Sequence, residues 1–250
     1  MKLVGMDLHI HSALSPCGGP EMVPPKVFAR AKQIGLEALV IADHNTAENQ
    51  KAFLKCAKTM NIQALPGMEV QSKEDVHILC IFDTLDQALT LQKLVYDHLP
   101  PIKNKTEIFG EQVIVDDLGN KVAEEERLLL TGTNLSIDDI VINVREIGGL
   151  ALPAHIDRPA FSLWSHLGFI PEYLGFVGVE LTHHLPRNKE QIKYLEEKKL
   201  GIVMSSDAHW LNQLQRPYTW AYIEEFSVAE LTLAIKGEKG RYLVYDKEKF

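Results

Sequence analysis

Short apolar runs alternate with helix-like segments along this chain, and nearly every run carries a histidine or a carboxylate at one end. The run over 37–42 is almost continuous, which is typical of a strand buried on both faces of a parallel sheet. Similar runs occupy 4–10, 62–66, 76–82, 149–154, 176–181 and 201–206. Strands that alternate with helices predict an α/β fold built on a parallel sheet. Because barrel enzymes keep their active sites at the C-terminal ends of the strands, the placement of the polar residues favours a barrel over an open sheet.

Helix boundaries are marked by residues that commonly begin or end helices. Pro24-Pro25 begins a helix that Gly35 is expected to close. Thr46 can cap a second helix that runs to about residue 60, and Ser136 can cap another that runs to about residue 147. These signals support the alternation of strands and helices.

The stretch over about 100–133 interrupts the alternation. Residues 112–122 resemble a hairpin that turns at Gly119-Asn120. We expect an insertion here, which is either a lid over a site or a purely structural excursion. No repeat, low-complexity segment or linker divides the rest of the chain, so residues 1–250 are expected to form one barrel domain.

The composition is that of an ordinary soluble globular protein, with 46% hydrophobic and 24% charged residues. The three cysteines, Cys17, Cys56 and Cys80, form no CxxC pair, and such sparse cysteine suits a reducing cytosol. No apolar run approaches the roughly eighteen residues of a membrane span, and the N-terminus lacks the features of a signal peptide. We therefore predict a cytoplasmic protein without membrane contact.

The net charge of −8 argues against a protein that binds nucleic acid through a broad basic surface. It leaves room for a phosphate pocket lined by metal ions, because bound cations supply positive charge locally. We expect a small phosphorylated substrate and regard a long nucleic acid as unfavoured. The oligomeric state is left open.

The first metal candidate is the pair His9 and His11, one strand step apart. Successive side chains of a strand point to opposite faces, so both imidazoles are expected on one face, with Leu8 and Ile10 on the packing face. Alone, such a pair can also be two hydrogen-bonded core histidines. Further candidates follow the other strands, and the full set is His9, His11, His44, Glu69, His77, His155, Asp207 and His209.

This set of side chains is too large for one ion. Imidazole with carboxylate suits zinc, manganese or iron, and we expect two or three divalent ions. Glu69 can bridge two of them, since each carboxylate oxygen can bind one cation.

The motifs around these residues resemble the PHP (polymerase and histidinol phosphatase) family of metal-dependent phosphoesterases. They are the Asp-Leu-His-Ile-His-Ser segment over 7–12, Asp-His-Asn over 43–45, Gly-Met-Glu over 67–69, His77 before an apolar run, Ala154-His155, and Ser-Asp-Ala-His over 206–209. The resemblance implies a distorted (β/α)7 TIM-like barrel, with up to three metal ions at the C-terminal ends of the strands.

The resemblance also implies a distribution of ligands among the three metal sites. His9, His11, Glu69 and Asp207 would hold the first ion; Glu69, His77 and His155 the second; His44 and His209 the third. The family often has Ser-Asp-Gly in the loop after the first motif, whereas this chain has Pro16-Cys17-Gly18. Cys17 either supplies a thiolate to the third ion or is a small buried residue beside a weak or absent site.

Other polar residues near these motifs allow more than one role each. Arg158 suits a bidentate phosphate contact but is equally consistent with a surface arginine. His183 and His184 follow a strand end and either contact substrate or cap the next helix. Asp43 can bind a metal, but it is more often expected to support its neighbour His44 or cap a helix. Asp7 is expected to orient a histidine ring or lie in solvent at a strand start.

The predicted function is hydrolysis of a small phosphate ester by metal-activated water, with Glu69, His155, Asp207 and His209 as the catalytic residues. No covalent nucleophile motif, P-loop or dinucleotide fingerprint occurs. The alternatives are an exonuclease or phosphodiesterase acting on short oligonucleotides, and a metal-binding PHP module without activity. An amidohydrolase-type barrel is disfavoured because no bridging lysine is found at a strand end.

Overall fold

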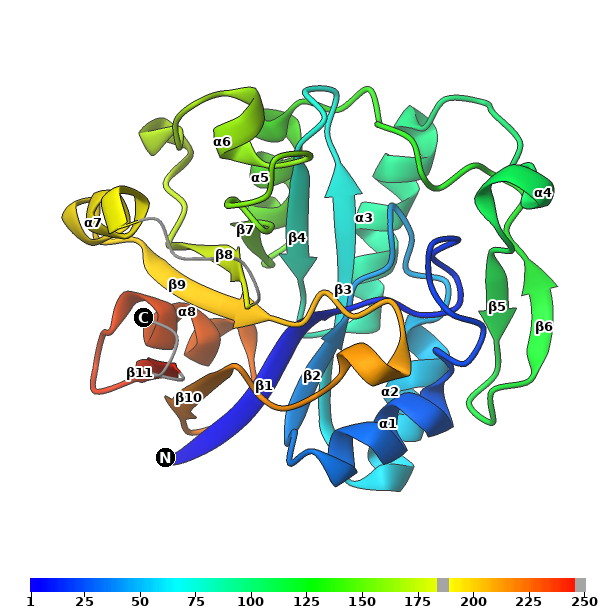
Figure 1. The fold of residues 1–250 in the computed structure, drawn as a ribbon, viewed down its shortest axis with the longest axis horizontal. Coiled ribbons are helices and arrows are strands. Elements are labelled where there is room, and N and C mark those ends of the chain that lie inside the picture. The colour runs from blue at the N-terminus through cyan, green and yellow to red at the C-terminus, as the bar shows by residue number, and fades with distance from the viewer. Residues whose placement is uncertain (184–188, 246–250) are drawn as a thin grey trace.

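The computed structural model describes residues 1–183 and 189–245, and its strands form the frame that carries the polar residues (Figure 1). The strands are β1 (Lys2–Ile10), β2 (Ala38–Ile41), β3 (Gln63–Gln71), β4 (His77–Ile81), β5 (Val113–Val115), β6 (Lys121–Glu124), β7 (Leu150–Pro153), β8 (Gly178–Thr182), β9 (Gly201–Ser205), β10 (Thr219–Ile223) and β11 (Tyr242–Tyr245). The α-helices are α1 (Pro24–Gln33), α2 (Gln50–Met60), α3 (Leu85–His98), α4 (Thr106–Phe109), α5 (Ile137–Glu146), α6 (Leu163–His166), α7 (Lys189–Glu197) and α8 (Val228–Lys236). Two 3₁₀ turns, η1 (Glu172–Leu174) and η2 (Leu211–Gln213), complete the chain.

Seven strands pair into one curled sheet in the order β11-β10-β1-β2-β3-β4-β7 (Figure 1). β1, β2 and β3 run parallel, whereas the remaining pairs of this sheet are antiparallel. β8 and β9 form a separate parallel pair. Backbone hydrogen bonds from His11 to Ala208 (2.9 Å) and from Ile156 to Glu180 (3.0 Å) join this pair to the strand ends of the larger sheet. The predicted α/β fold is confirmed, while a (β/α)7 barrel stays a prediction.

β3 is longer than predicted and returns directly as a hairpin. It runs past residue 66 to Gln71, and only 72–76 separate it from β4. A parallel connection needs a crossover of about a dozen residues or more, so these strands pair antiparallel. The strand predicted over 62–66, with its end near Gly67-Met68-Glu69, extends two residues beyond that end. Gly67 lies inside this strand, close to Val40 of β2. A Cβ at Gly67 would lie 2.4 Å from Val40 Cγ1.

Three apolar cores hold the frame. One joins β1, β2, β4, β7, β9 and β10 through residues such as Met6 and Val203, so it lies inside the curl of the sheet. A second packs α1 and α2 against β1 and β2, with Phe28 and Phe53 in contact. The third joins β3 and β4 to α3 and α5. β1 and β2 are therefore buried on both faces, which the apolar run over 37–42 predicted for β2.

The helix starts follow the predicted caps with one exception. Ser136 caps α5 by accepting the N–H of Asp139. Thr46 is not a cap, since α2 begins at Gln50 and the Thr46 hydroxyl instead lies 2.7 Å from the Tyr96 hydroxyl. Across the described residues, no helix combines the length and the apolar character needed to cross a membrane.

The 100–133 stretch contains α4 and the β5–β6 hairpin, which turns at the predicted position. The Asp116 N–H donates to the Asn120 carbonyl (2.9 Å) across this turn. The hairpin lies on the loop that follows β1, because the Val113 N–H donates to the Ala13 carbonyl (3.0 Å) and Asn49 Nδ2 donates to the Val113 carbonyl (3.1 Å). A lid role, and one domain over 1–250, stay predictions.

Candidate metal centre

The pairing of β1 with β2 shifts register between Asp7 and Ile10. This bulge sends Leu8 to the core inside the curl and Ile10 to the core under α1 and α2. The expectation that both side chains share one packing face is wrong for that reason. His9 and His11 nevertheless converge, with their Nε2 atoms 3.1 Å apart and both rings fully buried. Bulges are common beside active sites because they re-aim side chains.

Glu69, on β3, lies at the centre of the cluster. Its Oε1 is 2.8 Å from His77 Nδ1 and 3.0 Å from His155 Nε2, while its Oε2 is 2.9 Å from His44 Nδ1. Burial disfavours the charged carboxylate, but the imidazoles of His77, His9 and His44 hold the pKa of Glu69 well below its ordinary value. The two oxygens therefore face different imidazoles, which is the arrangement that a bridging carboxylate requires.

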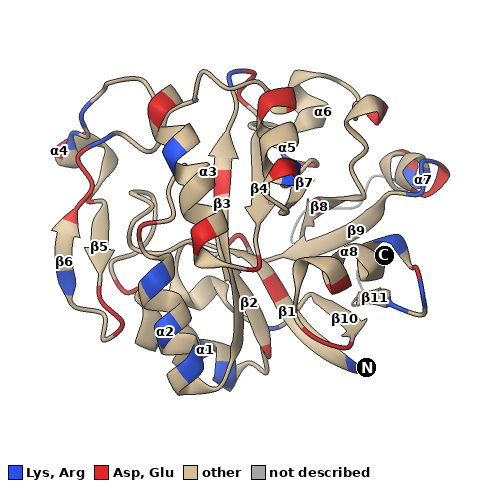
Figure 2. Cartoon of the chain, turned by 180° about the vertical axis from the view of Figure 1, so that it is seen from behind, with Lys and Arg blue, Asp and Glu red and all other residues tan. Residues whose placement is uncertain are grey.

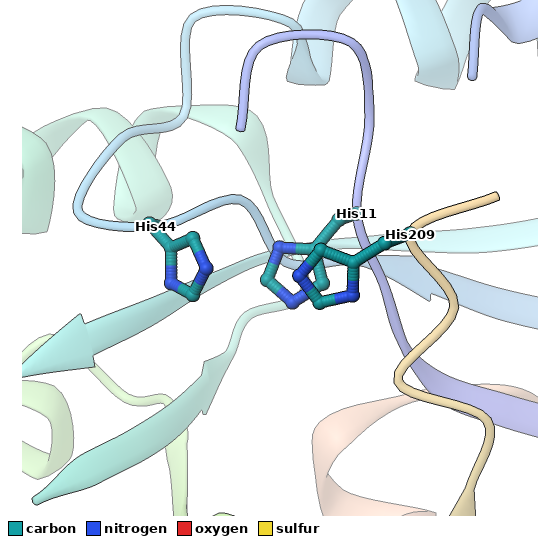
Figure 3. A group of neighbouring side chains, drawn as sticks. All are labelled: His11, His44 and His209. Carbon is teal, nitrogen blue, oxygen red and sulfur yellow. The ribbon is translucent and has the colours of Figure 1, made fainter. Parts of the chain in front are cut away.

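Asp207 and His209 follow β9 and complete the cluster from the other side. Asp207 Oδ1 lies 3.0 Å from His11 Nε2, and Asp207 adopts φ of +49°. The rings of His44 and His209 both lie next to His11, with ring centroids 4.5 and 4.0 Å away, and their own centroids are 5.9 Å apart (Figure 3). Among the described residues, donor atoms within 4.8 Å of one another form three groups, which are His9-His11-Glu69, His44-Glu69-His77 and His11-His44-His209.

Hydrogen bonds at Nδ1 of His9 and of His11 determine which ring nitrogen carries the proton. The Ser15 hydroxyl donates to Asp43 Oδ1 (2.7 Å), so it accepts from His11 Nδ1 (3.0 Å). His9 Nδ1 faces a carboxylate oxygen, Glu180 Oε2, at 2.9 Å. In the neutral rings both Nδ1 atoms therefore carry the proton, and both Nε2 atoms present lone pairs to the cluster.

The space between His9, His11 and Asp207 is consequently surrounded by hydrogen-bond acceptor atoms. His9 Nε2, His11 Nε2 and Asp207 Oδ1 lie within 3.0 to 3.6 Å of one another. Although burial opposes protonation, the carboxylates of Glu180, Glu69 and Asp207 raise the pKa of His9 well above its ordinary value. This space thus favours a positive charge, and the residues present fit a divalent cation.

Glu180, on β8, is a member of this site that the sequence did not indicate. It is 1% exposed, and its Oε2 contacts His9 Nδ1 and accepts the N–H of His155 (3.0 Å). Carboxylates that orient ligating histidines in this way are a regular part of metal sites. A single glutamate inside an apolar run has no motif around it, so only its unusual position in a buried strand marked it.

Asp7 and Asp43 hold the backbone around the ligands. Asp7 is buried and accepts the N–H groups of His9 and Ser206, and burial raises its pKa to about 6. The alternative of a solvated Asp7 is therefore wrong. Asp43 accepts the Ser12 hydroxyl (2.6 Å) and the Ser12 N–H (2.7 Å), and so fixes the loop that follows His11.

Cys17 is positioned beside the third group of histidines. Desolvation of the sulfur opposes ionisation, but hydrogen bonds with His209 and His44 lower the pKa of the thiol to about 6. The thiolate is the form that binds metals.

A cavity of about 340 Å³ opens onto the cluster. Its lining residues are Cys17, His44, Glu69, Gln71, His77, Leu130, His155, Arg158, Phe161, Asp207 and His209. Arg158 reaches it with Nη2 2.6 Å from Asp207 Oδ2. His183 is not among the lining residues, and its ring stacks on Tyr218. His184 lies outside the described residues.

Comparison with known proteins gives a family and a set of similar folds. A family model described as the PHP domain matches residues 7–249.

The uncharacterized protein YqxK of Bacillus subtilis is 24% identical over 259 residues, which cover 98% of this chain and 65% of that protein. The lesion-specific endonuclease EndoQ from Pyrococcus furiosus has a TM-score of 0.73 and 23% identity, over 97% of this chain and 58% of that one. A protein of Bifidobacterium adolescentis described as a metal-dependent phosphoesterase has a TM-score of 0.57 and 17% identity, over 82% of this chain and 88% of that one.

This chain therefore spans less than two thirds of the length of YqxK and of EndoQ. A second structure of Endonuclease Q contains a 27-mer duplex substrate with an abasic lesion at its active site (TM-score 0.72, 23% identity, over 96% of this chain and 58% of that one). This finding contradicts the expectation of a small substrate with long nucleic acid unfavoured, because a protein of similar fold is described with a DNA duplex as its substrate.

The expectation failed because a net charge is a sum over the whole chain. The adjacent helices α1 and α2 carry six basic residues and no acidic residue (Figure 2). These residues are Lys26, Arg30, Lys32, Lys51, Lys55 and Lys58. Nucleic acid responds to such a local surface rather than to the total charge.

Proposed function

Because the chain belongs to the PHP domain family, we propose that it is a metal-dependent phosphoesterase that hydrolyses phosphodiester bonds in nucleic acid. The observation that carries this proposal is the buried space between His9, His11 and Asp207, where acceptor atoms face one another and a cation would satisfy them. The cavity of about 340 Å³ beside it is open to a substrate.

We assign the ligands in three overlapping sets. His9, His11, Glu69 and Asp207 would hold the first ion, and Glu69, His77 and His155 the second. His44, His209 and the Cys17 thiolate would hold the third. When bound, such ions neutralise a phosphodiester and lower the pKa of a water molecule toward neutrality.

Residues around the ligands orient them. Glu180 holds the proton of His9 on Nδ1, and Ser15 does the same for His11, so both Nε2 atoms stay available. Arg158 lies against Asp207 at the cavity wall. Its planar guanidinium can bind a non-bridging phosphate oxygen while it remains paired with the carboxylate.

The basic helices favour nucleic acid over a small ester. Lys26, Lys32, Lys51, Lys55 and Lys58 are exposed. α2 starts beside the metal cluster, because Asn49 Nδ2 donates to the Ser12 hydroxyl (2.9 Å), one residue from His11. A strand that lies along α1 and α2 would therefore reach the cavity, with its phosphates neutralised by lysine.

The test is a cleavage assay with labelled single-stranded, duplex and abasic duplex oligonucleotides in Mn²⁺ and in Zn²⁺. We expect hydrolysis that is lost after metal removal and restored by metal addition. Label at one end separates internal cleavage from stepwise removal of terminal nucleotides. Bis-p-nitrophenyl phosphate and p-nitrophenyl phosphate distinguish a diesterase from a monoesterase. Hydrolysis of the monoester alone, or of none of these substrates with either metal, would overturn the proposal.

A further inference from the structure

Phe161 is an aromatic side chain at the wall of the metal cavity. It is 42% exposed and lines the cavity with Leu130 and Arg158. Its ring lies nearly parallel to that of His77, with the centroids 4.8 Å apart and an angle of 18° between the planes. One face of the phenyl ring is thus covered by a candidate metal ligand.

The backbone of Phe161 is held in an unfavourable conformation. Its φ is +57°, which is a rare value for a bulky residue. The Phe161 carbonyl accepts the N–H of His77 (3.0 Å), and its own N–H donates to His166 Nε2 (3.3 Å). Strained backbone of this kind persists where surrounding contacts impose it, and it is concentrated at functional sites.

Packing alone does not account for this placement. A side chain needed only to cover His77 would gain most from being buried, yet two fifths of Phe161 stays accessible. The residue combines an accessible aromatic ring, a strained backbone and a position one imidazole away from Glu69 (His77 Nδ1 to Glu69 Oε1, 2.8 Å).

We propose that Phe161 is a stacking platform for a nucleobase next to the phosphodiester that is cleaved. The inference rests on the proposed function and names the part of the substrate that this wall recognises. His77 covers one face of the phenyl ring, and the base stacks on the accessible side. Phe161 then lies between the imidazole and the base in a stack of three rings. Stacking on an aromatic side chain tolerates any base, because every base has a π face.

The experiment compares the binding of two short ligands to the metal-loaded protein. One is a phosphorothioate-linked dithymidylate, which resists hydrolysis, and the other is the same compound with one base removed. We expect the intact ligand to bind more tightly. Phe161→Ala should reduce that preference roughly tenfold, which is the order of base–aromatic stacking, and Phe161→Trp should retain it.

Two controls make the result specific. Phe169, which is 53% exposed and does not line the cavity, serves as the matched substitution, and Phe169→Ala should leave the preference intact. The metal content and thermal melting of each variant show whether His77 has been disturbed. Equal binding of both ligands by the wild type overturns the inference. So does an equal weakening of both ligands by Phe161→Ala, because that would make the ring a support for His77 alone.

This readout is independent of turnover. If no oligonucleotide is cleaved but the base preference depends on Phe161, the proposed function fails and the stacking site stands. If cleavage occurs and the preference is absent, the function stands and the stacking site fails.

Discussion

Glu180 Oε2 lies 2.9 Å from His9 Nδ1 and also accepts the backbone N–H of His155. One carboxylate on β8 therefore joins candidate ligands that come from β1 and from the end of β7. The second oxygen, Oε1, is buried and has no hydrogen-bond partner among the residues that the structure describes. This geometry indicates that Glu180 orients the imidazole ring of His9.

Glu180→Gln should weaken metal binding by about 10- to 100-fold, the usual cost of losing a group that orients a ligating histidine. The amide can direct its NH₂ group at His9 Nδ1, which would move the ring proton to Nε2 and block the ligand atom. Competition with a chromophoric chelator measures the affinity, and the exposed Glu196→Gln on α7 is the control. An affinity equal to that of the wild type would show that Glu180 does not set the tautomer.

Glu69→Gln should abolish hydrolysis and lower the metal content, and its effect should exceed that of Glu180→Gln. The reason is that Glu69 contacts His44, His77 and His155 and belongs to two of the groups of donor atoms. Elemental analysis and oligonucleotide cleavage test both parts, with circular dichroism as the check on folding. Full activity in a folded variant would exclude a bridging role.

Removal of metal should destabilise the protein. Ions that bind only the folded state at 100 times their dissociation constant contribute about 2.7 kcal/mol. Without them the buried acceptors around His9, His11 and Asp207 lose their partner. Thermal melting with and without a chelator, followed by readdition of Mn²⁺ or Zn²⁺, measures the shift. Superimposable melting curves would contradict a buried metal cluster.

Cys17 should react with iodoacetamide in the metal-free protein, and zinc should protect it. A thiol pKa of about 6 means that the reactive thiolate predominates above pH 6 and that reaction slows as the pH falls below it. Cys80 provides an internal control, because burial raises its pKa. Mass spectrometry of modified peptides reports both sites. Reaction at Cys17 that zinc does not slow would remove the thiolate from the third metal site.

Charge reversal on the basic helices should weaken duplex binding. The double variant Lys26→Glu with Lys51→Glu should bind duplex more weakly. The slope of the logarithm of the binding constant against the logarithm of the salt concentration should become shallower by about 0.9 for each phosphate that lysine no longer neutralises. Fluorescence anisotropy at several salt concentrations provides both numbers. Lys193→Glu with Lys199→Glu changes the same charge on and beside the mixed-charge helix α7 and should have little effect. Equal losses of affinity in both double variants would indicate a general charge effect.

The sequence by itself determined the α/β class and the set of polar residues that meet at the strand ends. His9, His44 and Asp207 could be selected in advance because the end of a strand is a local property, readable from a few neighbouring residues. The hairpin turn at Gly119 was predictable for the same reason. These features depend on side-chain period and turn chemistry within short segments.

The tertiary structure decided what depends on pairing between distant segments. The bulge beside His9 arises from the register of β1 on β2, and the close approach of Gly67 to Val40 arises from the packing of β3 beside β2. Glu180 acts on His9 from 171 residues away, so no local pattern could show which residue it contacts. The basic surface likewise exists only because α1 packs beside α2, and a sum of charges along the chain cannot describe it.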